Sequence, residues 1–439
     1  MPDTVILADD LSGAADCGIA CATAGHETIV VLGERPDEPA CRVLSIDADT
    51  RGRAQGEAAA ETARLARLHA PPGRLVFRKL DSTLRGHVAA ELAALLAVRR
   101  EAGPAAVLLA PAFPATGRTT RDGVQRLDGV ALQDTAVWRR ERMAGTAFLP
   151  AMLAQAGLRT VVVGLGQVRA DGLGALVARL AADAGTDVLA CDAETDDDLA
   201  RIAATGFGLG PSLVWAGSAG LAAGLARLLP RGVDGASRPA AGALQGPVLF
   251  VVGSLSAVSA RQVAALSALP GVEPLVVASG VLRQGEGSAA WRDAEDTLER
   301  ALGSGRDVVV SLAAEPDADP REGLALCHAL ARLAAPHAGR IGALVSAGGE
   351  TARAVLLAFG ATGLRLCGEI EPGVPLSLTE GGRTMPVVTK AGAFGRDDTL
   401  LRCRAVLHGV RHAVAPGRQE SMGSAQTRKG SEDPLIPFT

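Results

Sequence analysis

The sequence predicts an α/β protein that consists of two α/β domains with largely parallel sheets. Short β-branched and aliphatic runs alternate with Ala-, Leu- and Arg-rich segments of helical spacing along the 439 residues of the chain. This length exceeds what one ordinary core supports. Residues 229–246 are rich in Gly and Pro and lack a hydrophobic pattern, which is typical of a linker. We therefore expect domains over 1–228 and 247–415, a linker or hinge over 229–246, and a disordered tail over 416–439.

The predicted elements alternate between strand and helix in both domains. A helix is expected to begin at Leu11, and the spacing of Ala and Leu predicts two more over 56–70 and 88–101. Residues 110–123, which follow a strand and contain two prolines, are expected to form a long ordered loop. The predicted strands are 5–8, 28–32, 42–46, 75–79, 106–110, 160–163, 187–190 and 213–216, then 248–252, 274–278, 307–311, 343–346, 364–369 and 385–390.

Composition and charge exclude several classes of protein. A net charge of −4 and only 3% aromatic residues argue against a nucleic-acid partner. Proteins that bind nucleic acids usually have a basic face, and many have aromatic side chains on which bases stack. The apolar runs are too short to span a bilayer, so no membrane partner is expected. The seven cysteines are scattered and odd in number, which predicts reduced thiols in a cytoplasmic protein and no zinc site. The oligomeric state stays open, with a homodimer among the options.

The first predicted strand ends on two adjacent carboxylates, Asp9 and Asp10. Ligands of open α/β sheets bind beyond the carboxyl ends of strands, which is where both acids lie. One of them can cap the helix that begins at Leu11, a contact worth about 1 kcal/mol. The other is not explained by capping, so we expect at least one to bind a hydroxyl group or a metal ion. The sequence leaves open which one does so.

Three further polar clusters follow predicted strands of the first domain. One contains Lys79, Asp81, Ser82 and Arg85; the others are residues 47–51 and 117–120. Arg and Lys suit a carboxylate, and Asp and Ser suit hydroxyl groups. A solvated turn can have the same composition. Four polar clusters at four strand ends nevertheless favour a pocket for a polar small molecule.

In the second domain, glycines follow predicted strands at three places. Gly348 and Gly349 lie between a strand and a helix, where closely approaching backbone N–H groups can hold phosphate. A Gly pair also occurs for packing reasons alone, but Gly253-Ser254 and the loop 390–395, entered by Lys390, favour phosphate binding. The Walker A motif is absent, and the missing dinucleotide fingerprint disfavours a dehydrogenase.

Eight motifs in order along the chain resemble those of the four-carbon acid sugar kinases, which phosphorylate tetronates with ATP. The resemblance extends over both domains, from residue 5 to about residue 400. The matching stretches are 7–16, 79–86, 110–114 with 117–120, 217–221, 252–254, 348–351, 369–375 and 390–395.

The resemblance implies an N-terminal domain that binds the acid sugar, a C-terminal domain that binds ATP, and an active site in the cleft between them. It assigns the substrate to Asp10, Arg51, Lys79, Leu80, Asp81 and Ser82. It assigns ATP to Ser254, Gly348, Gly349, Glu350, Thr351 and Gly392, to which we add Lys390. On this basis we expect Arg51, Arg85 and Lys79 to hold the carboxylate, Asp9 or Asp10 to accept the hydroxyl proton, and Mg²⁺ to bridge the ATP phosphates.

Two departures and one agreement bear on the activity. The family loop usually reads Lys-Ser-Gly-Asn-Phe-Gly, whereas Ala391 and Ala393 stand here in place of Ser and Asn. The loss of two side-chain donors makes a non-catalytic acid-sugar sensor an alternative. The Thr83-Leu84-Arg85 stretch favours phosphorylation of the C4 hydroxyl of D-threonate or D-erythronate, with a 3-oxo-tetronate 4-kinase as the other enzymatic alternative.

Overall fold

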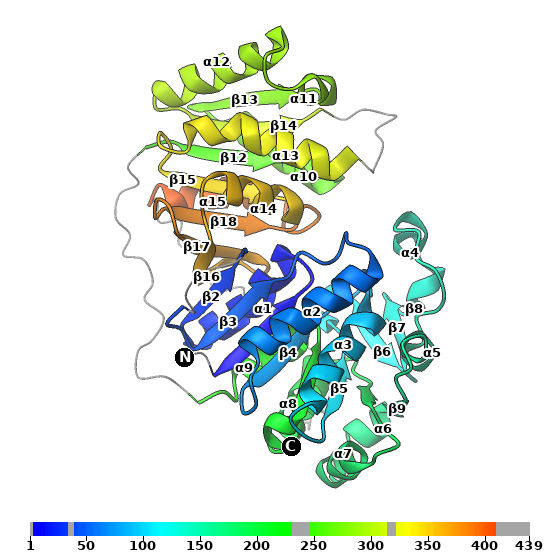
Figure 1. Cartoon of the computed structure of the whole chain (residues 1–439). Coiled ribbons are helices and arrows are strands. Elements are labelled where there is room, and N and C mark those ends of the chain that lie inside the picture. Colours follow the sequence, from blue (N-terminus) through cyan, green and yellow to red (C-terminus); the bar gives the residue numbers. More distant parts are fainter. Residues whose placement is uncertain (1–2, 34–38, 231–245, 314–321, 410–439) are drawn as a thin grey trace, which may run out of the picture.

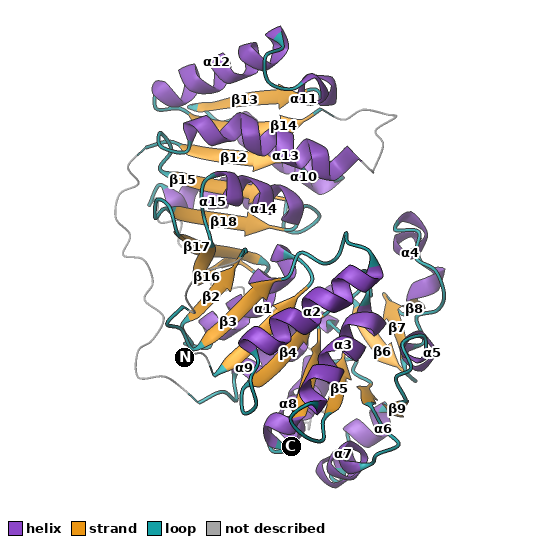
Figure 2. Ribbon diagram, viewed as in Figure 1, coloured by secondary structure: helices purple, strands orange, loops and turns teal. Residues whose placement is uncertain are grey.

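The computed structural model describes residues 3–33, 39–230, 246–313 and 322–409 (Figure 1). Most of the predicted linker and all of the predicted tail lie outside these residues. Figure 2 shows an α/β architecture in which helices cover both faces of a long twisted sheet. The predicted fold class is thereby confirmed. No helix of the described residues combines the length and the apolar character needed to cross a membrane.

Fifteen strands of the described residues form one sheet. Their order is β13-β14-β12-β15-β18-β17-β16-β2-β3-β1-β4-β11-β5-β10-β9. In the first half the strands are β1 (Thr4–Ala8), β2 (Thr28–Val31), β3 (Val43–Asp47), β4 (Leu75–Lys79), β5 (Ala106–Ala110), β9 (Thr160–Val163), β10 (Val188–Cys191) and β11 (Leu213–Gly217). In the second half they are β12 (Val248–Val252), β13 (Val272–Val277), β14 (Asp307–Leu312), β15 (Ala343–Ala347), β16 (Gly363–Glu371), β17 (Val374–Glu380) and β18 (Pro386–Lys390).

The helices alternate with these strands in both halves. In the first half they are α1 (Leu11–Thr23), α2 (Gln55–His69), α3 (Val88–Arg100), α4 (Ala136–Arg140), α5 (Leu149–Ala154), α6 (Leu165–Val168), α7 (Leu173–Ala182), α8 (Asp196–Phe207) and α9 (Ala219–Ala226). In the second half they are α10 (Ala257–Ser267), α11 (Ser279–Gln284), α12 (Ala289–Gly303), α13 (Gly323–Ala334), α14 (Gly349–Ala358) and α15 (Thr399–Leu407).

The two halves share the sheet through an antiparallel hairpin of the second half. The strands on either side of this hairpin run parallel to one another within each half, whereas β16 pairs antiparallel with β2. Its register places Gly363 opposite Val31 and Arg365 opposite Ile29. In Figure 1 the hairpin lies between the upper and the lower part of the molecule. The ends of the parallel strands of both halves therefore meet around the hairpin.

Alternation along β1 explains why the sheet is buried on both faces. Val5 and Leu7 pack into a core under α2 and α3, while Ile6 packs into the opposite core with α8 and α9. Helix α1 extends a third core across the boundary, because Leu11 and Ala14 pack in one cluster with residues of α14 such as Val355. Strands buried on both faces read as continuous apolar runs, which is why they were predictable from the sequence.

The structure corrects one prediction and adds four strands that were not predicted, three of them in a small separate sheet. Residues 110–123 are not a single loop, because β6 (Arg118–Arg121) begins within them and pairs with β7 (Val124–Leu127) and β8 (Val130–Ala131). The turn between β6 and β7 is Asp122-Gly123, and both residues have positive φ, at 52° and 71°. Asp-Gly between strands is the strongest short hairpin signal and could have revealed β6. β17 was also missed.

All seven cysteines lie within the described residues, where each is buried and forms no disulfide.

Candidate active site

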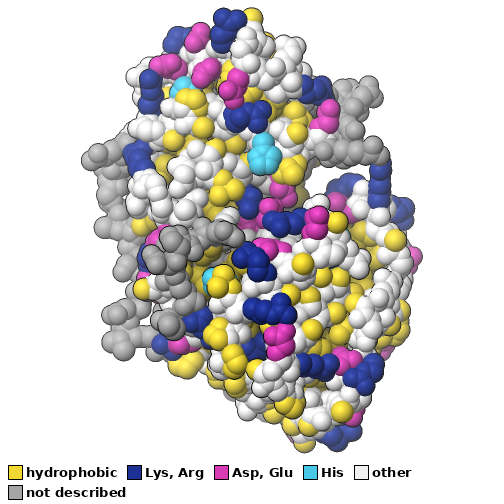
Figure 3. Space-filling model, in the orientation of Figure 1, with side chains coloured by type: hydrophobic (Ala, Val, Ile, Leu, Met, Phe, Trp, Pro, Cys, Tyr) yellow, Lys and Arg dark blue, Asp and Glu magenta, His cyan; other side chains and the backbone are white. Residues whose placement is uncertain are grey.

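A cavity of about 880 Å³ lies between the two halves at the carboxyl ends of the parallel strands. Figure 3 shows side chains of both charge signs gathered where the upper and lower parts of the molecule meet. Eleven of the predicted site residues line the cavity. They are Asp10, Arg51, Lys79, Asp81, Ser82 and Arg85 from the first half, and Ser254, Gly349, Glu350, Lys390 and Gly392 from the second.

Four predicted site residues do not line the cavity. Asp9 and Leu80 are buried beside it, with 3% and 2% of their surfaces exposed. Gly348 and Thr351 lie at the start of α14 without lining the cavity, and the Thr351 hydroxyl is 3.3 Å from the Cys327 thiol. These four residues can support the site but do not face its interior.

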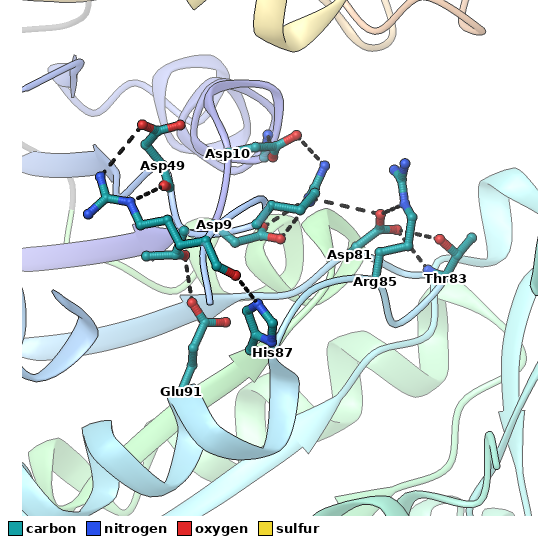
Figure 4. Close-up of polar contacts among 12 residues, drawn as sticks. Asp9, Asp10, Asp49, Asp81, Thr83, Arg85, His87 and Glu91 are labelled. Carbon is teal, nitrogen blue, oxygen red and sulfur yellow. Dashed lines mark hydrogen bonds and ion pairs between the residues drawn. The ribbon is translucent and has the colours of Figure 1, made fainter. Parts of the chain in front are cut away.

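The adjacent acids Asp9 and Asp10 have different environments (Figure 4). Both carboxylate oxygens of Asp9 accept hydrogen bonds from Arg51, at 2.7 Å from Nε and 2.9 Å from Nη2. Asp10 caps α1, because its Oδ1 accepts from the Gly13 N–H at 2.8 Å, and its Oδ2 accepts from Arg51 Nη1. A carboxylate offers about four acceptor positions, so Asp10 retains acceptor capacity toward the cavity.

The two acids also differ in their proton affinity. Burial disfavours the charged form of Asp9, but the charge and hydrogen bonds of Arg51 outweigh burial and hold the pKa of Asp9 below its usual value. For Asp10, burial together with the neighbouring charge of Asp9 raises the pKa above its usual value despite Arg51. A pair with separated pKa values is typical of sites that assign different roles to two carboxylates.

The arginines that were predicted to hold a substrate carboxylate already bind internal carboxylates. Arg51 is engaged by Asp9 and Asp10, and Arg85 forms a close ion pair with Asp81. Despite burial, the charges of Arg85 and Arg51 hold the pKa of Asp81 well below its usual range. Both arginines therefore help to fix the acids of the cavity in their charged form and orientation.

Lys79 is a buried cation surrounded by acids. Burial disfavours its ammonium group, but the negative charges of Asp16, Asp10 and Asp9 raise the pKa of Lys79 above its usual value. Gly13 permits this arrangement, because a Cβ atom at that position would lie 2.8 Å from Asp10 Oδ1 and 3.2 Å from Lys79 Nζ. A glycine in the first turn of α1 thus lets the acid and the ammonium group share the same space.

The second half brings the start of α14 directly against the start of α1. Gly348 has a φ of 107°, a conformation that strongly favours glycine. A Cβ atom on Gly349 would lie 2.6 Å from Ser12 Oγ and 3.7 Å from Asp10 Oδ2. The glycine pair therefore permits the N-terminus of a helix, which attracts anions, to approach the acid at the end of β1.

The loop after β18 is fixed through its backbone. Ser256 and Ser259, at the start of α10, donate hydrogen bonds of 2.8 and 2.7 Å to the Gly392 carbonyl oxygen. Ala391 and Ala393 line the cavity on either side of this anchored residue. The loop therefore keeps its position without the two family side chains that the sequence lacks.

An ion pair that the sequence did not reveal joins the two halves beside the cavity. Arg353 of α14 donates to Asp47 Oδ2 at 2.9 Å, and it lies 3.4 Å from a carboxylate oxygen of Asp49. Burial raises the pKa of Asp47 to about 7, although Arg353 opposes this rise. The two residues of this ion pair are about three hundred positions apart and leave no local signal in the sequence. The pair can therefore be recognised only from the fold.

The acids of the described residues do not form a ready-made metal cage, since no group of three or more His, Cys, Asp or Glu side chains is arranged to hold an ion. Mg²⁺ in phosphoryl-transfer sites needs less, because phosphates and water supply most of its ligands beside one or two carboxylates. Asp10 and Glu350 both line the cavity, and burial together with the negative charges of Asp49 and Asp10 raises the pKa of Glu350. Glu350 fits such a shared ion, because Asp10 is already engaged by Arg51 and by the Gly13 N–H.

Comparison with known proteins assigns a description to each half. Residues 4–225 match a family model described as a sugar-binding N-terminal domain, and residues 249–400 match one described as a nucleotide-binding C-terminal domain. A protein of Cupriavidus necator named D-threonate kinase is 44% identical over 405 residues, which cover 90% of this chain and 96% of that protein. A 3-oxo-tetronate kinase of Burkholderia multivorans is 30% identical over 436 residues, which cover 92% and 97% of the two chains.

A solved structure shares the fold. The crystal structure of a Salmonella typhimurium protein superposes with a TM-score of 0.76 at 23% identity, covering 93% of this chain and 99% of that chain.

Proposed function

Because the chain belongs to the family of four-carbon acid sugar kinases, we propose that it transfers the γ-phosphoryl group of ATP to the C4 hydroxyl of D-threonate or D-erythronate. One observation carries this proposal. The helix start at Gly349, suited to phosphate, approaches Asp10, which is suited to a hydroxyl group, within a cavity that both halves line. The 44% identity to a D-threonate kinase favours D-threonate as the preferred substrate.

Asp10 is the proposed general base. It faces the cavity, it retains acceptor capacity, and its pKa is raised, whereas Asp9 is buried and saturated by Arg51. Asp10 accepts the proton of the C4 hydroxyl as the oxygen attacks the γ-phosphorus. The bond from phosphorus to the β,γ-bridging oxygen breaks in the same step, and ADP leaves. Asp9 acts indirectly, because it holds Arg51 against Asp10.

The remaining substrate contacts come from the loop after β4. Asp81 and Ser82 face the cavity and suit the C2 and C3 hydroxyl groups. Lys79 lies among Asp9, Asp10 and Asp16, which places its charge close to the reacting end of the substrate, where negative charge collects during transfer. Arg51 and Arg85 position the carboxylates that they bind. Leu80 is a packing residue of this loop.

The nucleotide is proposed to lie against α14, Ser254 and the loop after β18. Backbone N–H groups at Gly349, Glu350 and Thr351 suit the phosphates, and Lys390 adds a positive charge. Glu350 would hold Mg²⁺ with the phosphates, and the ion, when bound, would neutralise charge on the transferring group. Leu255 and Phe394 expose apolar surface at the same cavity, which suits the adenine ring.

Lys390 predicts how the apparent affinity for ATP depends on pH. Burial lowers the pKa of Lys390 to about 8, so the side chain is charged below this pH and neutral above it. Phosphate binding favours the charged form, and we therefore expect KM for ATP to be flat up to pH 8 and to rise about tenfold per pH unit beyond it. Initial rates at saturating D-threonate between pH 6.5 and 9.5 measure this.

The arginine variant provides the control for that profile. Lys390→Arg keeps a positive charge throughout the range, so the rise in KM should disappear, while Lys390→Met should have a high KM at every pH. A wild-type KM for ATP that stays constant to pH 9.5 would show that Lys390 does not bind the phosphates.

A panel of four-carbon acids tests the proposed activity. D- and L-threonate, D- and L-erythronate and 3-oxo-tetronates are each incubated with ATP and Mg²⁺, and ADP formation is measured together with the position of the phosphate ester. We expect turnover of a D-tetronate with the ester on C4. Turnover of 3-oxo-tetronates alone would assign the chain to that branch, and binding of acids without ADP formation would identify a sensor.

A further inference from the structure

The hairpin formed by β6 and β7 presents an arginine, Arg118, to the wall of the cavity. Its backbone is fixed on both sides. The Phe113 N–H donates to the Arg118 carbonyl at 2.8 Å, and the Arg118 N–H donates to the Phe113 carbonyl at 3.2 Å. Gly117, with a φ of 73°, makes the tight turn that starts the strand. Arg118 therefore extends from a rigid part of the wall.

The same hairpin is bound to the proposed substrate loop by a buried amide. Gln125 of β7 donates through Nε2 to the Ser82 carbonyl at 2.8 Å and to the Pro111 carbonyl at 3.3 Å. Its Oε1 accepts from the Thr120 hydroxyl at 2.6 Å, and both Gln125 and Thr120 are fully buried. This network fixes the position of Arg118 relative to Ser82.

The guanidinium group of Arg118 differs from those of Arg51 and Arg85 in having no counterion. Among the described residues it forms no side-chain hydrogen bond or ion pair, and its Nε is buried without a partner. Burial lowers the pKa of Arg118, and the more distant charges of Asp81 and Asp128 compensate only in part. A partly desolvated cation without a partner gains most from an anionic ligand.

We propose that Arg118 binds the carboxylate of the acid-sugar substrate and is the main determinant of acid over neutral sugar. This inference rests on the proposed function. It differs from the expectation that Arg51 and Arg85 hold the carboxylate, because those two arginines are neutralised by acids of the protein itself. Ser218 and Ala219 at the start of α9 line the cavity as well, so a helix N-terminus adds to the attraction.

The order of the strands makes this assignment geometrically consistent. Asp10 follows β1 and Arg118 lies beyond β5, with β4 and β11 between them. Three steps between neighbouring strands amount to about 14 Å. The extended side chain of an arginine and a four-carbon acid together can bridge this distance. The carboxylate would then lie at Arg118 and the C4 hydroxyl at Asp10, on the side of the nucleotide.

The test compares Arg118→Met with a matched variant of the same strand, Arg121→Met. Arg121 points to the other face of β6, is exposed, and pairs with Glu194 at 3.4 Å. For each protein, kcat/KM is measured with D-threonate and with D-threitol, which replaces the carboxylate by a neutral alcohol. Binding of D-threonate without ATP is measured by calorimetry.

We expect Arg118→Met to lower kcat/KM and the affinity for D-threonate about 10- to 100-fold, the range for a lost hydrogen bond to a charged group. KM for ATP and kcat/KM for D-threitol should stay within twofold, Arg118→Lys should recover part of the loss, and Arg121→Met should behave as wild type. Equal losses of kcat/KM for D-threonate and D-threitol in Arg118→Met, or no loss for either, would overturn the inference. The proposed function would still hold in that case if the wild-type protein phosphorylates D-threonate.

The calorimetric measurement separates failure of the two proposals. If wild type binds D-threonate without phosphorylating it, the proposed transfer fails, and weaker binding by Arg118→Met would still support the carboxylate site. If wild type binds no four-carbon acid, both proposals are overturned.

Discussion

Asp10→Asn is expected to lower kcat by about 10²- to 10⁴-fold, the usual contribution of a general base. Asn is as good a helix N-cap as Asp, so the hydrogen bond to the Gly13 N–H can persist and α1 should keep its start. The amide, however, cannot accept the hydroxyl proton at neutral pH. KM for ATP should change little. Steady-state ADP formation with D-threonate measures the rate, and thermal unfolding measures the integrity of the fold.

Two comparisons give this experiment its meaning. Asp197→Asn removes one carboxylate from the exposed first turn of α8 and should leave kcat unchanged. Asp9→Asn should lower kcat less than Asp10→Asn, because Asp9 acts through Arg51. A turnover of Asp10→Asn within threefold of wild type, or a larger loss in Asp9→Asn, would assign the base to another group.

The sequence was informative about strands because of how the sheet is buried. Both faces of β1, β4 and β5 are buried. Their continuous apolar runs, and the polar residues that directly follow them, can therefore be recognised in the sequence. β6 escaped prediction because it carries Arg and Thr where an alternating apolar pattern would be expected. It is joined to β7 by the hydrogen bond from Thr120 to Gln125 and by the turn at Gly123. The local signal of this hairpin is the Asp122-Gly123 turn.

The distinction between Asp9 and Asp10 could not be predicted for a different reason. The roles of two adjacent residues at a strand end depend on the side chains that contact them. Here Arg51, from the loop after β3, donates hydrogen bonds to both Asp9 and Asp10. In the same way, the sequence cannot show that Arg85 pairs with Asp81, whereas the Arg118 guanidinium has no hydrogen-bond or ion-pair partner in the part of the chain that the structure describes. The composition of a pocket can be predicted from polar strand ends, but the pairing of charges within it depends on three-dimensional distances.

The replacement of two family residues by Ala391 and Ala393 has a structural compensation in the loop after β18. The loop motif expected from the resemblance carries two side-chain donors there, whereas this chain has alanine at both positions. Ser256 and Ser259 nevertheless hold the Gly392 carbonyl, and Lys390 Nζ lies 3.3 Å from the same oxygen. An anchored backbone with a neighbouring charge is sufficient for phosphate binding in many loops of this kind. Phosphate binding by this loop, which the proposed kinase activity requires, therefore depends on the backbone at Gly392.

Gly392→Ala is accordingly expected to lower kcat/KM for ATP by about a hundredfold, as displacements of about 1 Å in an active site can do. A Cβ atom at this position would approach both Oγ and Cβ of Ser254 more closely than side chains permit. Because Ser256 and Ser259 fix the Gly392 carbonyl, the strain must displace Ser254 or detach the loop. Binding of D-threonate without ATP should stay within twofold, since its proposed contacts lie in the first half.

Gly303→Ala is the matched control for this substitution. Gly303 is the last residue of α12 in the same half, and a Cβ atom there would meet nothing within 4 Å. The control should retain wild-type kcat/KM for ATP, so a loss confined to Gly392→Ala would reflect the crowding at Ser254 and not the general effect of a methyl group. If Gly392→Ala uses ATP within threefold of wild type, the nucleotide does not depend on this loop. The absence of the family Ser and Asn would then favour a different phosphate contact, with the start of α14 as the remaining candidate.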